Sequence, residues 1–178
     1  MEDHNITNSL IKKAMRGNAE AYGQLIENHK DYLYRTAYLY TKNEQAALDA
    51  VGDCILSGFQ SIKTLREPAY FKTWLTRILL NVANDSFRKG KNLILTNEIE
   101  KAGFEKDISI EERLDLYQAI ENLPEKYRSV IILKYFNELK VSEIAYTMDI
   151  PEGSVKAYLA RARKDLRIYL KEDYFYAN

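Results

Sequence analysis

The hydrophobic pattern is clearest in the last forty or so residues of the chain. Val141, Ile144, Ala145 and Met148 recur at i, i+3, i+4 and i+7, which places them on one face of a short helix. Residues 149–153 (DIPEG) interrupt this pattern. Proline is accommodated only in the first turn of a helix, and the residue before it disfavours helical angles. The pattern therefore predicts a helix, a tight turn and a second helix.

The second helix has an apolar side and a basic side. The apolar side consists of Val155, Leu159, Ala162, Leu166, Tyr169 and Leu170, and the opposite side of Lys156, Ala157, Ala160, Arg161, Lys164 and Arg167. Small residues between cations let a helix approach a grooved partner, and an α-helix fits the major groove of B-DNA. This arrangement is typical of a helix-turn-helix DNA reader. An ordinary helical hairpin with a solvated basic face is the alternative.

Helices are also predicted throughout the first half of the chain. Residues 7–16 form a short amphipathic helix that stops at Gly17, and residues 18–41 keep helical period as one long helix. In the third helix, residues 43–63, we expect Leu48, Val51, Ile55, Phe59 and Ile62 to point inward and Asp49 and Asp53 outward. Like charges at i and i+4 do not favour a helix. The acidic pair therefore either meets a basic partner or lies on a solvated face.

The fourth helix begins near Pro68 and runs to about residue 89. We expect Phe71, Trp74, Leu75, Ile78 and Val82 to face a core, and Thr73, Arg77, Leu80, Asn81 and Asn84 to lie away from it. Asparagines and an arginine beside aromatic residues suit single-stranded nucleic acid, whose bases are held by stacking and by hydrogen bonds to their edges. Trp74 itself fits a core position better than a stacking platform.

The stretch between the two helical regions loses its helical period at residues 90–109. Residues 92–112 contain two basic and six acidic residues, whereas 71–91 and 153–171 contain five and six basic residues against one acid each. Two basic patches therefore flank an acidic connector. Further helices at 110–122 and from 124 onward lead into the helix-turn-helix. We expect an all-α fold of two helical domains joined by a flexible acidic linker.

Composition narrows the possible functions. The chain has 26 basic and 26 acidic residues in 178, which excludes a uniformly basic nucleic-acid coat. Cys54 is the one cysteine, so no internal disulfide can form and a reduced compartment is expected. No run of 18 apolar residues occurs, and the N-terminal residues lack the basic start and apolar core of a signal peptide. We expect a soluble, cytoplasmic protein.

Several motifs follow one another along the chain: Gly17-Asn18 to Tyr22, Asp49 to Asp53, Phe71-Lys-Thr-Trp74-Leu75 to Asn81, Leu123-Pro124 with Arg128, and residues 143–166. In this order they resemble the extracytoplasmic-function (ECF) sigma factors of bacterial RNA polymerase, in the sigma-70 family. Each motif is weak alone, but their order and separations cover nearly the whole chain. The resemblance implies a four-helix sigma region 2 at 6–91, a linker at 92–110 and a helix-turn-helix region 4 at 111–171, with neither region 1.1 nor a folded region 3.

The resemblance also implies roles for particular residues. Leu48, Asp49, Asp53 and Ile55 would dock on the β′ clamp helices of core RNA polymerase. Arg77, Asn81, Asn84 and Arg88 would engage the opened −10 element. Ser154, Lys156, Ala157, Tyr158, Arg161 and Lys164 would face the −35 duplex. An anti-sigma factor that could hold the protein at the membrane is a further expected partner, and no cofactor, metal or small-molecule substrate is expected.

Three positions depart from the family pattern, and two other functions compete with it. Gly52 stands where glutamine is common, and Ala157-Tyr158 stands where Ser-Arg is common, which leaves the −35 sequence preference open. A stand-alone helix-turn-helix regulator would need dimer symmetry to match half-sites, yet no long coiled-coil segment is evident. A His-Asp metal hydrolase would need histidines followed by aspartates, and neither His4 nor His29 is. We therefore do not expect an enzyme.

Overall fold

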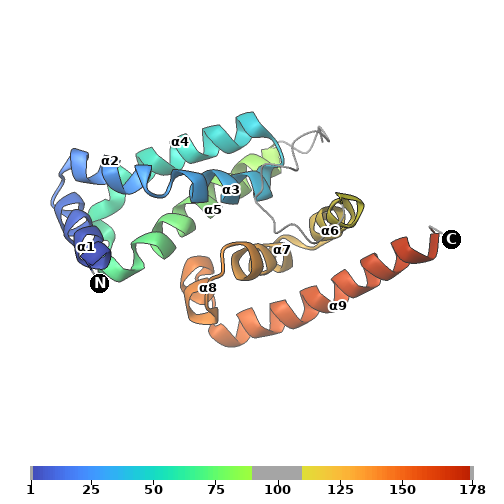
Figure 1. The fold of residues 1–178 in the computed structure, drawn as a ribbon. Helices are drawn as coiled ribbons and strands as arrows, with labels where there is room; N and C mark the ends of the chain where they lie inside the picture. Colours follow the sequence, from blue (N-terminus) through green and yellow to red (C-terminus); the bar gives the residue numbers. More distant parts are fainter. Residues whose placement is uncertain (1, 90–109, 177–178) are drawn as a thin grey trace. The chain divides into compact units, whose positions relative to one another are not determined.

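The computed structural model describes residues 2–89 and 110–176, with the side chains of residues 6–83 and 115–170. Every secondary-structure element in these ranges is helical, which confirms the predicted all-α fold. The chain divides into two compact units, Met1–Glu98 and Ile99–Asn178, drawn in blue to green and in yellow to red in Figure 1. The predicted acidic linker at 92–110 lies outside the described residues, apart from its last residue.

The first unit contains helices α1 (Glu2–Met15), α2 (Ala19–Glu27), α3 (Lys30–Thr41), α4 (Glu44–Ser61) and α5 (Phe71–Lys89), with 3-10 turns at Ile62–Thr64 and Pro68–Tyr70 between α4 and α5. Asparagine side chains begin two of these helices. Asn18 Oδ1 accepts from the Ala21 N–H, and Asn43 Oδ1 accepts from the Ala46 N–H, each at 2.8 Å. Gly17 has a φ of +92° and makes the turn between α1 and α2, where side chains are rarely tolerated.

The prediction of one continuous helix over residues 18–41 is wrong, because the chain breaks at Asn28 and His29. The ring Nδ1 of His29 hydrogen-bonds the Leu25 carbonyl at 2.7 Å, and the backbone N–H of His29 bonds the Ile26 carbonyl at 2.9 Å instead. The His29 ring therefore bonds the Leu25 carbonyl, which the backbone N–H of His29 would bond in a continuous α-helix. Apolar periodicity missed this break because α2 and α3 both bury their apolar residues in the same unit.

Helix α5 packs against both α3 and α4, and α3 and α4 also contact each other (Figure 1). Thr73 and Leu80, which we expected to lie away from the core, are therefore buried, with 3% and 4% of their surface exposed. One apolar stripe does not describe a helix that is covered on two sides. Trp74 is buried at 6% exposure, so its placement in the core is confirmed.

The predicted inward face of α4 is wrong along the helix, whereas Ile62, in the 3-10 turn that follows, is buried at 1% exposure as expected. The buried residues of this helix are Ala47, Ala50, Cys54 and Gly58. Leu48 and Phe59, which we expected to face inward, are 49% and 39% exposed, while Val51 and Ile55 are half-buried. A side made of small residues allows α4 to approach α3 and α5 closely, and this packing turns the larger apolar residues outward.

Gly58 makes room for the side chain of Tyr22, which is buried between α2 and α4. The Tyr22 hydroxyl donates to the Ile55 carbonyl at 2.9 Å. A Cβ atom on Gly58 would lie 2.4 Å from Tyr22 Oη, closer than real Cβ contacts come. Burial raises the pKa of Tyr22, which keeps its hydroxyl protonated as a donor. This hydrogen bond ties α2 to α4.

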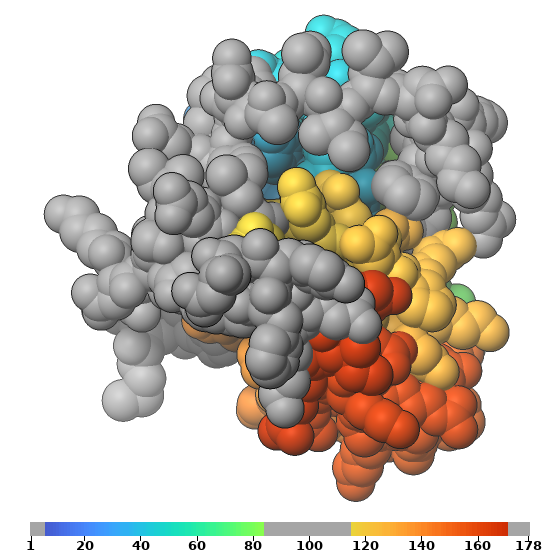
Figure 2. Space-filling view, turned by 90° about the vertical axis from the view of Figure 1, so that its right-hand side faces the viewer, coloured from blue at the N-terminus to red at the C-terminus, as the bar shows by residue number. Residues whose placement is uncertain are grey.

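The second unit contains α6 (Ile110–Asn122), α7 (Glu125–Ile131), a π-helical turn at Ile132–Phe136, α8 (Val141–Met148) and α9 (Glu152–Tyr176). Helix α9 contacts α6, α7 and α8, and Figure 2 shows the yellow residues of α6 and α7 beside the orange-red residues of α9. The core of this unit includes Val130, Ile131, Ile132, Leu133, Ile144, Val155, Leu159 and Ala162. The predicted apolar side of the second helix is thus confirmed at its first three positions.

The turn between α8 and α9 has the geometry that the sequence predicts for a helix-turn-helix. Asp149 adopts the left-handed conformation at φ 56° and ψ 47°, and the Ile150 N–H donates to the Ala145 carbonyl at 3.1 Å. The Pro151 carbonyl then accepts the Ser154 N–H at 2.9 Å in the first turn of α9. These two backbone bonds fix the two ends of the turn. At the other end of α8, where the helix starts, the Lys140 N–H donates to Glu143 Oε2 at 2.7 Å.

Candidate interaction surfaces

The outward side of α4 is an exposed apolar surface with two carboxylates. We name it the α4 outer face, and it consists of Leu48, Asp49, Gly52, Asp53, Ile55, Leu56 and Phe59. Leu56 is 63% exposed, more than Leu48 or Phe59. Large apolar side chains grouped on one face mark a site where a partner binds. Asp49 Oδ1 accepts from Gln45 Nε2 at 2.9 Å, and Asp53 is exposed one turn further along.

The four residues that we expected to bind polymerase all lie on α4, and Leu48, Asp49 and Asp53 are exposed there. Sequence reasoning did not include Leu56 in this set and placed Phe59 in the core. The signal that could have found both is the run of small residues Ala47, Ala50, Cys54 and Gly58, which has helical spacing of its own.

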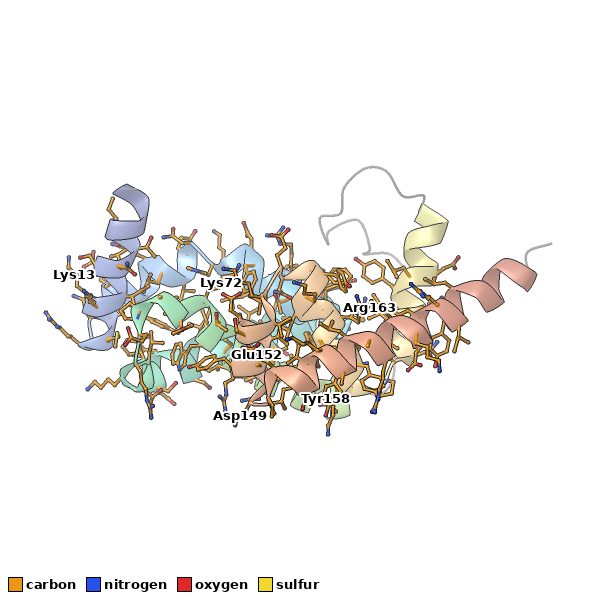
Figure 3. The ribbon with its side chains drawn as sticks, turned by 90° about the horizontal axis from the view of Figure 1, so that it is seen from below. Lys13, Lys72, Asp149, Glu152, Tyr158 and Arg163 are labelled. Atoms are coloured by element: carbon orange, nitrogen blue, oxygen red, sulfur yellow. The ribbon has the colours of Figure 1, made fainter. Side chains whose placement is uncertain are left out.

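Helix α5 presents two of the residues that we expected near opened DNA. Asn81 is exposed and Arg77 is half-buried. Asn84 and Arg88 belong to the same helix, but their side chains lie outside the described residues. Another cation of this helix is Lys72, labelled in Figure 3, whose Nζ lies 4.3 Å from the centre of the Tyr32 ring.

The first half of α9 carries the residues that we expected to face duplex DNA. Lys156, Ala157, Arg161 and Lys164 are exposed, and Ser154 and Tyr158 are half-buried. The Tyr158 ring packs on the Tyr127 ring of α7, with centroids 5.6 Å apart. Arg161 Nη1 donates to Tyr127 Oη at 3.4 Å, and this hydrogen bond raises the pKa of Arg161. Tyr127 thus joins the basic side of α9 from a different helix.

Arg163 differs from the other cations of α9. Figure 3 shows Arg163 and Tyr158 on opposite sides of the helix. Arg163 Nε donates to the Leu159 carbonyl of its own helix at 3.2 Å. The exposed cations on the predicted basic side of α9 are Lys156, Arg161, Lys164 and Arg167.

In the described part of the chain, no group of three or more histidine, cysteine, aspartate or glutamate residues is arranged so that it could hold a metal ion. The same residues include no helix with the length and apolarity needed to cross a membrane.

Comparison with known proteins identifies both units. Residues 25–92 match the family model described as Sigma-70 region 2, and residues 113–166 match Sigma-70, region 4. RNA polymerase sigma factor SigV of Bacillus subtilis is 38% identical over 151 residues, which are 83% of this chain and 90% of SigV. ECF RNA polymerase sigma factor SigW of the same organism is 30% identical over 178 residues, covering 91% of this chain and 95% of SigW.

Solved structures agree with these matches. CnrH, solved in complex with the cytosolic domain of CnrY, superposes with a TM-score of 0.75 at 25% identity, over 94% of this chain and 99% of CnrH. The sigma factor RpoE of Bartonella quintana, solved with the anti-sigma factor NepR, superposes with a TM-score of 0.69 at 21% identity and shows the same fold. The two helical units are thus those of a transcription initiation factor.

The chain belongs to the ECF sigma factors of the sigma-70 family, and it directs promoter recognition by RNA polymerase. The resemblance seen in the sequence is thereby confirmed. Members of this family are not enzymes.

Proposed function

We propose that this sigma factor binds core RNA polymerase through the α4 outer face. The observation that carries the proposal is that α4 buries its small side and exposes Leu48, Leu56 and Phe59 beside two carboxylates. Apolar contact supplies affinity at such a surface, and the carboxylates supply charge complementarity toward a basic partner. The family assigns the docking site to the β′ clamp helices, and Asp49 and Asp53 are its acidic contacts.

The two units divide the promoter between them. Sigma region 2 spans residues 6–91 and region 4 spans 111–171, joined by 92–110, and the family matches at 25–92 and 113–166 support this division. In region 4, the basic side of α9 lies in the major groove of the −35 element, where Ser154, Lys156, Ala157, Tyr158, Arg161 and Lys164 contact bases and phosphates.

In region 2, α5 holds the opened −10 element. Asn81 is exposed and uncharged, so its amide can bond a base edge that becomes accessible only after the strands separate. Arg77, Asn84 and Arg88 lie one or two turns away on the same helix and serve the same strand.

An anti-sigma factor is the regulatory partner that we propose, and the cytoplasm is the place of action. CnrH shares the fold of this chain over 94% of this chain's length, and its structure was solved in complex with the cytosolic domain of CnrY. A partner that covers the apolar α4 outer face would compete directly with polymerase.

Run-off transcription tests the proposal with core polymerase, a template pool with randomised upstream sequence, and the protein present or absent. Specific transcripts are expected only when the protein is present. Asp49→Arg with Asp53→Arg should weaken competition for core polymerase at least about tenfold, because reversed charges repel a basic surface. Glu20→Arg with Asp31→Arg, which changes two exposed carboxylates away from α4, is the matched control. Equal competition by both double variants would remove the docking assignment.

A further inference from the structure

A tyrosine outside the helix-turn-helix contacts the basic side of α9. Tyr127 lies in α7, thirty-four residues before Arg161 in the chain, and its hydroxyl accepts a hydrogen bond from Arg161 Nη1 at 3.4 Å. The ring of Tyr127 also packs on the ring of Tyr158, with centroids 5.6 Å apart and planes inclined at 51°. Tyr127 and Tyr158 are half-buried, whereas Arg161 is exposed. The Arg161 guanidinium is therefore bonded to a hydroxyl whose ring is itself packed on a tyrosine of α9.

This contact limits where the guanidinium can go. A free arginine side chain has many rotamers and loses about 2 kcal/mol of conformational freedom when it becomes fixed. Tyrosine has only two side-chain torsions, and the Tyr158 ring holds Tyr127 further. The hydrogen bond uses one of the five N–H groups of Arg161, so about four remain for a phosphate or a base edge. Arg163 instead bonds back to the Leu159 carbonyl, so this arrangement distinguishes Arg161 from its neighbour.

We propose that Tyr127 is a positioning residue that holds Arg161 in the orientation in which it contacts −35 DNA. This inference rests on the proposed function of the basic side of α9. The Tyr127 hydroxyl supplies the hydrogen bond, and the Tyr158 ring keeps that hydroxyl in place. Arg161 then docks with part of its ordering already complete, which strengthens binding without any further contact to DNA.

Tyr127→Phe isolates the hydroxyl, because phenylalanine keeps the ring pair with Tyr158. One exposed hydrogen bond corresponds to about a two- to fivefold loss in affinity. The number of neutralised phosphates stays the same, so the slope of log affinity against log salt should not change. Arg161→Ala, in contrast, removes a cation and should reduce that slope by about one if the cation contacts a phosphate. In the Arg161→Ala background, Tyr127→Phe should have no further effect.

The experiment uses holoenzyme reconstituted from this protein and core RNA polymerase of Bacillus subtilis. The DNA probe is a duplex template that the wild-type holoenzyme selects from a pool with randomised upstream sequence. Initial binding is measured at several salt concentrations, at a temperature too low for strand opening. Tyr135→Phe is the matched control, since Tyr135 is a 54% exposed tyrosine in the π-helical turn of the same unit. Far-UV circular dichroism checks that each variant remains helical.

A two- to fivefold loss for Tyr127→Phe that disappears in the Arg161→Ala background supports the proposal, provided that Tyr135→Phe binds like the wild type. Equal losses with and without Arg161, or no loss while Arg161→Ala is defective, overturn it and leave the −35 role of α9 standing. If Arg161→Ala and Lys164→Ala both bind normally, the assignment of α9 to duplex DNA fails, and the role of Tyr127 fails with it.

Discussion

Two glycines on α4 should respond to alanine in opposite directions. Alanine in place of glycine in a helix interior raises the free energy of unfolding by about 1 kcal/mol through helix propensity alone. A Cβ atom at Gly52 meets nothing within 4 Å, so Gly52→Ala should stabilise the first unit by about that amount. A Cβ atom at Gly58 would lie 2.4 Å from Tyr22 Oη and 3.1 Å from Leu75 Cδ1. Gly58→Ala must therefore displace a buried side chain.

The cost of that displacement can be worked out from the contacts of Tyr22. Its ring is 4% exposed and packs on Phe59 at a centroid distance of 5.3 Å, so it has little room to move. Moving its hydroxyl forfeits the bond to the Ile55 carbonyl, about 1 kcal/mol, and overpacking costs about 1–3 kcal/mol. After the propensity gain is subtracted, Gly58→Ala should destabilise the unit by about 1–3 kcal/mol. The melting temperature should fall by about 4–8 °C per kcal/mol.

Removing the hydroxyl oxygen of Tyr22 should reverse the sign of the stability change that Gly58→Ala causes. Tyr22→Phe alone loses the hydrogen bond to Ile55, about 1 kcal/mol. The next atom of that ring, Cζ, would lie 3.5 Å from a Cβ on Gly58, which is ordinary contact. In the Tyr22→Phe background, Gly58→Ala should therefore be neutral or stabilising by up to about 1 kcal/mol, because helix propensity is then opposed only by the 3.1 Å approach to Leu75 Cδ1, the end of a flexible side chain. The two substitutions should show a coupling free energy of about 1–4 kcal/mol.

Two probes report the unfolding of the first unit alone. Trp74, the one tryptophan of the chain, is 6% exposed on α5, so its fluorescence reports urea unfolding of this unit. Burial raises the pKa of Cys54 to about 12, so its thiol should react with iodoacetamide only after the unit opens. The reasoning is refuted if Gly58→Ala stabilises as Gly52→Ala does. It is also refuted if Gly58→Ala costs the same with Phe at position 22.

Three further outcomes test the interaction surfaces. Leu56→Gln should leave stability within about 0.5 kcal/mol, since the side chain is 63% exposed, yet should weaken competition for core polymerase; normal competition would exclude Leu56 from the interface. The free protein should bind promoter duplex poorly near 150 mM salt, because its net charge is zero; tight specific binding in a gel shift would contradict this. Arg161→Ala with Lys164→Ala should impair initial promoter binding, whereas Asn81→Ala should impair opening and be rescued by a premelted template; equal rescue of both, or of neither, would contradict this division.

Local signals in the sequence were sufficient to predict the second unit. Pro151 forces a new helix to start, and Asp149 can adopt the left-handed angles that end the preceding one. The apolar side of α9 follows from spacing alone, because this helix packs along one side and Val155, Leu159 and Ala162 are buried there. Each of these features depends on residues within a few positions of one another.

Features that depend on contacts between distant residues could not be predicted. The break at His29 arises because its side chain takes the Leu25 carbonyl while its ring packs on Phe71, forty-two residues away in the chain. The contact between Tyr127 and Arg161 likewise joins two helices, and no spacing rule predicts it. For α4, the apolar periodicity was followed only through the large residues, and the side formed by Ala47, Ala50, Cys54 and Gly58 was overlooked.

The inverted packing of α4 follows from what a sigma factor must do. Such a protein folds alone and then binds a polymerase, so the contacts that hold α4 in place cannot be the contacts that bind the partner. Ala47, Ala50, Cys54 and Gly58 fix the helix by close approach to the unit, which leaves the α4 outer face free. Asp49 and Asp53 on that face disfavour its pairing with another copy of itself, because like charges would meet. On the proposed docking, binding and close packing are carried by opposite sides of one helix, so replacing an exposed side chain such as Leu56 should weaken binding and spare stability, whereas enlarging Gly58 should lower stability.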